Sequence, residues 1–176
     1  MKTLRTDKTG AVIEIRPLCH DDAKLLKSFY DSLSEETFHA RFGYSLSKHY
    51  SITDDWIFPE CDLDPKTHFQ LIALHDGEIV GIGTLDNRDD SPCFSEGTYD
   101  VSHVISDEYQ SRGIGSLLME GLLSEASYRK KKTRLKMEII AYTTIINWKA
   151  KALLKKFGFV LNRVDDGEMI WMYKVR

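Results

Sequence analysis

The stretch that decides the fold covers residues 109–116 and reads Tyr109-Gln110-Ser111-Arg112-Gly113-Ile114-Gly115-Ser116. The β-branched and aromatic residues from Thr98 to Ile105 come just before it and predict a strand. Apolar residues at helical spacing follow it, from Leu117 to Ala126. The sequence therefore predicts a strand, a glycine turn and an amphipathic helix in immediate succession.

A glycine turn that opens a helix favours binding of phosphate. Glycine permits backbone angles at which successive amides point the same way, and the start of a helix adds unpaired N–H groups. A dinucleotide-binding fingerprint would need a third glycine where this chain has Leu118, and a P-loop would need Gly-Lys-Ser or Gly-Lys-Thr. Neither pattern fits. The alternative is that the glycines only tighten the turn.

Upstream of this turn, the pattern predicts strands and helices in alternation. Alternating apolar and polar residues predict a strand over 12–16, and apolar residues at helical spacing predict helices over 23–33 and 34–41. Asp76-Gly77 indicates a hairpin between strands at 69–74 and 79–85. Residues 43–66 carry weak periodicity and several aromatics, Trp56 and Phe58 among them, so we expect a partly helical excursion that covers a binding site or packs on the core.

Downstream of the turn, three further elements are expected. A strand is predicted over 135–142, and Asn147 precedes a helical pattern that ends at Gly158-Phe159. A last hairpin joins 159–161 to 169–175 around Asp165-Asp166-Gly167. A length of 176 residues and 42% hydrophobic content suit one domain over residues 1–176.

Charge and cysteine usage narrow the class of protein. The net charge of −3 gives no general basic field for nucleic acid. Cys19, Cys61 and Cys93 form no C-x-x-C pair and have no His at metal-ligand spacing, so no metal is expected. The absence of a long apolar run predicts no membrane span and a cytoplasmic location. Nothing in the sequence indicates an oligomeric state.

The pattern Gln110-x-x-Gly113-x-Gly115 after a strand resembles the coenzyme A pyrophosphate loop of the GNAT acetyltransferase superfamily. The helix from Asn147 to Gly158-Phe159 is similar to the closing motif of the superfamily. Nearly the whole chain resembles the acetyltransferase domain of bacterial protein lysine acetyltransferases, through the segments Ile15-Arg16-Pro17-Leu18, Asp21-Asp22, Leu33-Ser34-Glu35-Glu36-Thr37 and Arg41-Phe42.

This resemblance implies an α+β fold with a mostly antiparallel, strongly twisted sheet of six or seven strands. Helices cover both faces, and the sheet is splayed between the fourth and fifth strands. It also implies direct transfer of acetyl from acetyl-CoA, as co-substrate, to an amine acceptor, either a protein lysine or a small molecule. An inactive acyl-CoA-binding module is the alternative. The implied coenzyme-binding residues are Val104, Ile105, Gln110, Ser111, Arg112, Gly113, Ile114, Gly115, Ser116 and Asn147.

The resemblance also implies a general base. An alkylamine has a pKa near 10.4, so forming the neutral nucleophile at pH 7 costs about 4.6 kcal/mol, and a group must accept its proton. Asp100 stands where the lysine acetyltransferases carry a glutamate, with Glu138, His103 and Glu96 as alternatives. Leu154 replaces the tyrosine that many members use to protonate the thiolate, which leaves that role to water or an unassigned group.

Overall fold

The computed structural model describes residues 2–43, 52–88, 96–133 and 136–175. Its helical segments are η1 (His20–Asp22), α1 (Ala23–Ser32), α2 (Glu35–Phe42), α4 (Asp54–Cys61), η2 (Asp107–Tyr109), α5 (Ile114–Thr133) and α6 (Trp148–Lys156). Its strands are β1 (Thr3–Thr6), β2 (Val12–Pro17), β3 (His68–His75), β4 (Glu78–Asn87), β5 (Thr98–Ile105), β6 (Glu138–Thr144), β7 (Val160–Asp165) and β8 (Glu168–Lys174).

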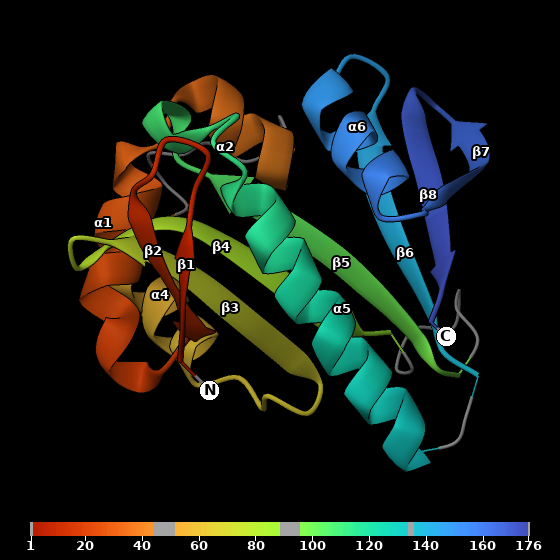
Figure 1. Cartoon of the computed structure of the whole chain (residues 1–176), viewed down its shortest axis with the longest axis horizontal. Helices are drawn as coiled ribbons and strands as arrows, with labels where there is room; N and C mark the ends of the chain where they lie inside the picture. The colour runs from red at the N-terminus through yellow and green to blue at the C-terminus, as the bar shows by residue number, and fades with distance from the viewer. Residues whose placement is uncertain (1, 44–51, 89–95, 134–135, 176) are drawn as a thin grey trace.

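These strands form one mixed sheet in the order β1-β2-β3-β4-β5-β6-β8-β7 (Figure 1). The pair β5–β6 is parallel, and each other neighbouring pair is antiparallel. The predicted α+β class and the mostly antiparallel sheet are confirmed. The sheet has eight strands rather than six or seven, because β1 pairs with β2 at the edge. The residues of β1 are largely exposed and do not alternate between buried and exposed positions, so no sequence pattern indicated this strand.

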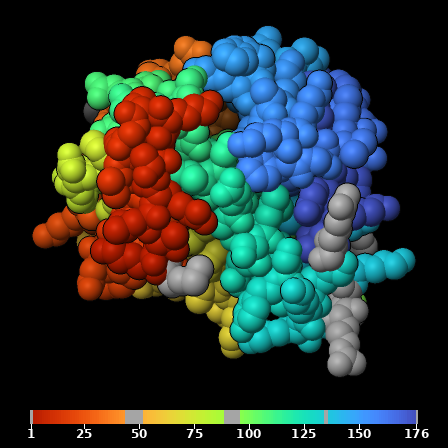
Figure 2. All heavy atoms as spheres, viewed as in Figure 1, coloured from red at the N-terminus to blue at the C-terminus, as the bar shows by residue number. Residues whose placement is uncertain are grey.

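Helices cover both faces of the sheet, as expected. One apolar core lies under α1, α2 and α4 and draws its buried residues from positions 23–104, including Ile72, Ile82 and Val104. The other core lies under α5 and α6 and includes Leu118, Leu122 and Leu154. Figures 1 and 2 show α5 between the N-terminal hairpin and the C-terminal strands.

The sheet splits between β5 and β6. Their parallel ladder holds three pairs only, Thr98 with Glu138, Tyr99 with Ile139 and Asp100 with Ile140. Beyond Asp100 the two strands separate, which Figure 1 shows as a widening gap between their ribbons toward α2 and α6. These are the fourth and fifth strands of the sequence prediction, so the predicted splay is confirmed at this place.

The excursion between α2 and β3 is partly helical, as expected, through α4. Trp56 packs its ring against Tyr30 at 5.4 Å and Phe42 at 5.6 Å, and Ile57 is buried. Phe58 is exposed. Trp56 therefore belongs to the core, which is the second of the two interpretations of these aromatics. Residues 44–51 of the same excursion lie outside the described part of the chain.

Candidate active site

The glycine turn between β5 and α5 has the geometry of an anion cradle. Ser111 and Gly113 have positive φ values of 64° and 95°, so the backbone turns sharply before α5 begins at Ile114. No described residue accepts a hydrogen bond from the amides of residues 111–115. These N–H groups stand at the positive end of a helix of 20 residues. The arrangement can bind an anion, such as a phosphate group.

Cationic side chains surround the cradle, and they come from distant parts of the chain. The Lys8 amide donates to the Arg112 carbonyl at 2.8 Å, which seats the β1–β2 hairpin on the turn. Lys156 Nζ from the end of α6 donates to Ser116 Oγ at 2.9 Å. The Arg112 guanidinium lies 4.5 Å from the centre of the Tyr109 ring. Positive charge from three elements therefore gathers where an anion would bind.

Gln110 connects the two sides of the split. Its Nε2 donates to Thr37 Oγ1 at 3.1 Å and to the Ile105 carbonyl at 3.3 Å. Its Oε1 accepts from Lys149 Nζ on α6 at 2.6 Å. The side chain is thus engaged with protein groups, and its first role is to hold α2, β5 and α6 together. The sequence indicated Gln110 but not its partners Thr37 and Lys149.

The turn is also anchored to the start of α2. Asp107 accepts hydrogen bonds from the Ser34 amide at 2.9 Å, the Ser34 hydroxyl at 2.7 Å and the Thr37 hydroxyl at 2.6 Å. Burial alone would raise the pKa of Asp107, but these bonds outweigh it and lower the pKa. The anionic carboxylate therefore fixes the cradle to the start of α2, which Ser34 caps.

The wall of the split on the β5 side contains Val104 and Ile105. Both residues pair with β4, opposite Ile82 and Gly81, and β6 has diverged at this level. On the other wall, Asn147 Oδ1 accepts from the Ala150 amide at 3.1 Å, so Asn147 caps α6. The coenzyme contact that the resemblance implies for Asn147 stays a prediction. Leu154 is buried in the core beneath α5 and α6.

The candidate bases occupy different environments. Asp100 is the last β5 residue paired with β6, so it lies where the split begins. His103 lies on the opposite face, where a methyl group built on Gly115 would meet its ring at 3.7 Å. Burial lowers the pKa of His103 to about 4, so its imidazole is neutral at pH 7. Glu138 stands at the closed end, 3.9 Å from Lys174, and Glu96 is exposed in the turn before β5.

Burial raises the pKa of Asp100, and a salt bridge opposes this effect. Arg88 Nη2 lies 2.8 Å from Asp100 Oδ2. Arg88 lies beyond the predicted strand over 79–85, so the sequence pattern did not indicate this partner. A carboxyl with a raised pKa is a better proton acceptor than an ordinary aspartate when ionised, which fits a general base.

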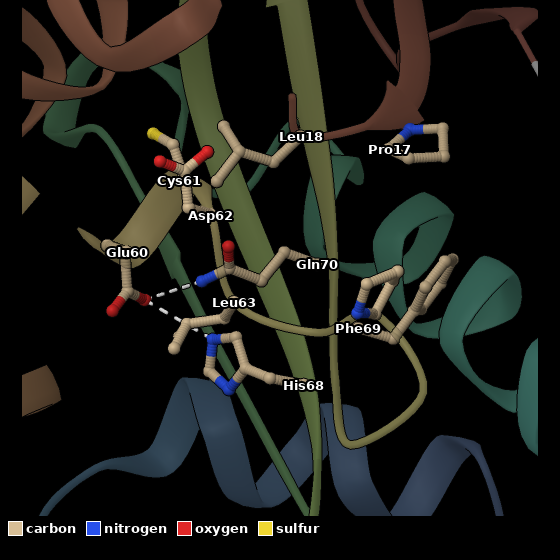
Figure 3. Close-up of a pocket in the computed structure, with 10 residues that line it drawn as sticks. Pro17, Leu18, Glu60, Cys61, Asp62, Leu63, His68, Phe69 and Gln70 are labelled. Carbon is tan, nitrogen blue, oxygen red and sulfur yellow. Dashed lines mark hydrogen bonds and ion pairs between the residues drawn. The ribbon is translucent and has the colours of Figure 1, made fainter. Parts of the chain in front are cut away.

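A charged row leads from Asp100 across the sheet. His68, Asp86 and Asp100 are paired in register on β3, β4 and β5. His68 contacts Asp86 and also Glu60 at 3.4 Å, and Glu60 accepts from Gln70 (Figure 3). Burial disfavours the imidazolium, but the two carboxylates outweigh it and raise the pKa of His68 to about 9.

Figure 3 shows the pocket at the far end of this row, between α4 and strands β2 and β3. The pocket has a volume of about 300 Å³. Its lining includes Glu60, His68 and Gln70 but no residue of the cradle. We therefore place the coenzyme-binding candidate at the split and not in this pocket. The basic run Arg129–Lys132 is also excluded from the cradle. It ends α5, roughly 25 Å from the first turn at 1.5 Å per residue.

Two further observations concern other classes of site. Within the described ranges, no group of three or more His, Cys, Asp or Glu side chains is placed to hold a metal ion. None of the described helices has both the length and the apolar character needed to cross a membrane.

Comparison with known proteins gives the family. The model of the Acetyltransferase (GNAT) family matches residues 26–159, which include the whole turn and both walls of the split. The chain belongs to the GNAT acetyltransferase family.

This GNAT acetyltransferase is 29% identical over 159 residues to a curated acetyltransferase of Pseudomonas aeruginosa, an alignment that covers 89% of this chain and 80% of that protein. Its fold is similar to the GNAT domain of S. lividans PAT, with a TM-score of 0.82, 22% identity, and 98% and 96% of the two chains covered. It also resembles the PaiA N-acetyltransferase from Thermoplasma acidophilum in complex with coenzyme A, with a TM-score of 0.66, 20% identity, and 92% and 98% covered. At these identities the two solved structures support the fold alone.

Proposed function

We propose that this GNAT acetyltransferase moves an acetyl group from acetyl-CoA directly to a primary amine. One observation carries the proposal: the strands β5 and β6 separate after three pairs, directly beside a turn whose amides have no described acceptor. A long anionic thioester fits such a site, with its pyrophosphate at the amides of the turn and its acyl end inside the split. The Lys8, Arg112 and Lys156 side chains supply the matching charge.

The coenzyme supplies an activated acetyl thioester, and the protein orients it and accepts a proton. The neutral amine nitrogen attacks the acetyl carbon, the carbon–sulfur bond breaks, and the thiolate leaves. The nitrogen loses a proton as the amide forms, and the proton that the thiolate takes up balances this loss. We assign the ammonium proton to Asp100, which lies at the origin of the split with a pKa raised by burial. Asp100→Asn should lower turnover about a hundredfold, a typical general-base contribution, with acetyl-CoA affinity unchanged. Normal turnover in a folded Asp100→Asn variant would rule the assignment out.

For the acceptor, we propose the side chain of a protein lysine. Support comes from the resemblance of residues 15–42 to bacterial protein lysine acetyltransferases and from the likeness of the fold to the S. lividans PAT domain. The decisive measurement is release of free thiol from acetyl-CoA in the presence of a lysine-containing peptide, free lysine, a polyamine and an aminoglycoside. Preference for the peptide supports the proposal, and preference for a small amine replaces it.

Binding and catalysis are separated by two measurements. A ligand at about a thousand times its dissociation constant adds roughly 4 kcal/mol to the stability of the folded state, so acetyl-CoA should raise the melting temperature clearly. Binding without thiol release for any amine would indicate an acyl-CoA-binding module. No binding would mean that the glycines only shape the turn.

A further inference from the structure

The charged row beside the split is unusual for its position. The core of the sheet face under α1, α2 and α4 is apolar and includes Ile72, Ile82 and Val104. A polar row of Gln70, Thr84 and Ser102 lies between these residues and the charged row. Charged groups on such a face destabilise the fold unless each has a partner of opposite charge. Asp86 has His68 as its partner, and Asp100 has Arg88.

We propose that Arg88 is a positioning residue for the transfer reaction, because its guanidinium holds the Asp100 side chain as a carboxylate where β5 and β6 separate. The inference rests on the proposed function, in which Asp100 accepts the proton of the amine. Arg88 itself is not assigned any contact with the acceptor or the coenzyme.

The geometry of the pair supports this role. Arg88 follows β4, and its amide donates to the Thr98 carbonyl at 2.9 Å, which extends the β4–β5 ladder by one residue. Arg88 and Asp86 are two residues apart, so both side chains lie on the face that carries Asp100. The Asp100 side chain is only 15% exposed, whereas that of Arg88 is 41% exposed. The guanidinium thus reaches a nearly buried carboxylate from the rim of the sheet.

The groups around Asp100 explain why a cation is needed there. Burial raises the pKa of Asp100, and the Asp86 charge on β4 acts in the same direction. Arg88 lowers this pKa through its hydrogen bond and charge, and Arg41 on α2 adds a smaller effect. Tyr142 on β6 also lies near Asp100, and burial and the Asp100 charge raise its pKa further above its usual value, so its phenol adds no charge at pH 7. Arg88 is therefore the main group that keeps Asp100 ionised.

A salt bridge that only stabilised the fold would not need to lie where β5 and β6 separate. An apolar pair of similar volume commonly stabilises a fold as well as a buried ion pair does. Arg88 also has a buried Nε with no hydrogen-bond partner among the described residues, so its contacts are incomplete as a structural anchor. Among the described residues, the guanidinium donates its hydrogen bond to the carboxylate of Asp100, the proposed base.

The test is the pH dependence of kcat/KM for Arg88→Gln. Without the guanidinium, the carboxyl binds its proton more tightly, so the acidic limb of the profile should move upward by about one pH unit or more. Arg88→Lys keeps the charge and should leave the limb near its wild-type position. Lys27→Gln removes a cation from an exposed pair with Asp54, distant in the fold, and should not move it. The KM for acetyl-CoA should change little in all three.

An acidic limb that stays at the wild-type pH in folded Arg88→Gln overturns the inference. If Arg88→Gln does not fold, Arg88→Met offers the same test with a long uncharged side chain. An upward shift of its acidic limb supports the inference, and an unshifted limb overturns it. Asp100→Asn separates this inference from the function on which it rests. Normal turnover of Asp100→Asn would show that Asp100 is not the base, and Arg88 would then have no base to position. A large loss of turnover in Asp100→Asn, together with an unchanged pH profile of kcat/KM in Arg88→Gln, would overturn the Arg88 inference alone.

Discussion

Gly113 is the residue on which the shape of the cradle depends most directly. Its φ of 95° lies in the left-handed region, and a methyl group built on it would stand 3.4 Å from the Lys8 side chain. Space is therefore available, and the constraint comes from the backbone angle. An alanine there would be strained by about 1–2 kcal/mol and would place its methyl group beside the amides that we assign to the pyrophosphate.

Gly113→Ala should consequently weaken acetyl-CoA binding at least about tenfold, or about 1.4 kcal/mol, as measured by isothermal titration. Gly167→Ala is the matched control, because Gly167 has a φ of 82° in the distant β7–β8 turn, and a methyl group there would have nothing within 4 Å. Both variants should lose similar stability, and only the first should lose affinity. Equal affinities in two folded variants would contradict the role of the cradle.

Other residues of the site show what a sequence pattern can predict. Gly113, Gly115 and Gln110 lie in one short motif and were found from it. Lys8, Lys149 and Lys156 lie far away in the chain and meet the cradle only because β1 and α6 pack beside α5. Surface lysines carry no periodic signal, so their convergence required the three-dimensional arrangement.

At the scale of the element, a bulge in the β3–β4 hairpin determines which side chains share the face of Asp100. Leu74 pairs with Ile79, but Ala73 pairs with Gly81, so Val80 is the additional residue. Without this bulge His68 would face Leu85, since a slip of one residue moves each side chain to the other face. The Asp76-Gly77 turn predicted the hairpin correctly but could not predict the bulge. The sequence alone therefore did not predict that these charged residues form a row.

The same row predicts a pH dependence of stability. The pKa of His68 is raised to about 9, above its unfolded value of about 6.5. The stabilisation that the protonated His68 gains from Asp86 and Glu60 is complete below about pH 6.5 and is lost as the pH rises toward 9. The urea midpoint should therefore fall over this interval, and in His68→Gln the fall should be smaller. Identical slopes for both proteins would show that His68 is not held as an imidazolium.

At the scale of the whole molecule, the two halves of the sheet contact one another weakly. The β5–β6 ladder has three pairs, while Gln110 and Lys149 join the walls near the open end. A thioester that lies in the split would contact both walls and restrict their relative motion. The sequence predicted the location of the split by resemblance, but the length of the ladder follows from packing that no local pattern records.

Hydrogen exchange measured with and without acetyl-CoA tests this arrangement. Amides of residues 101–105 on β5 and 141–144 on β6 should exchange more slowly in the complex, because the ligand joins the two strands. The β7–β8 turn at 165–168 is the internal control and should exchange at the same rate in both states. Protection confined to the turn before α5 would mean that the acyl arm does not enter the split.

The short β5–β6 ladder also has a consequence for the order in which the protein is made. Synthesis proceeds from the N-terminus, and domains begin to fold as they leave the ribosome. The buried residues of the core under α1, α2 and α4 all lie between positions 23 and 104, so this core can form on a partly emerged chain together with the cradle. The second wall comes only with β6, α6 and the final hairpin. A nascent chain would therefore hold the proposed phosphate-binding turn before it has a place for the acyl group, and binding of the coenzyme across both walls would have to follow synthesis of the final hairpin.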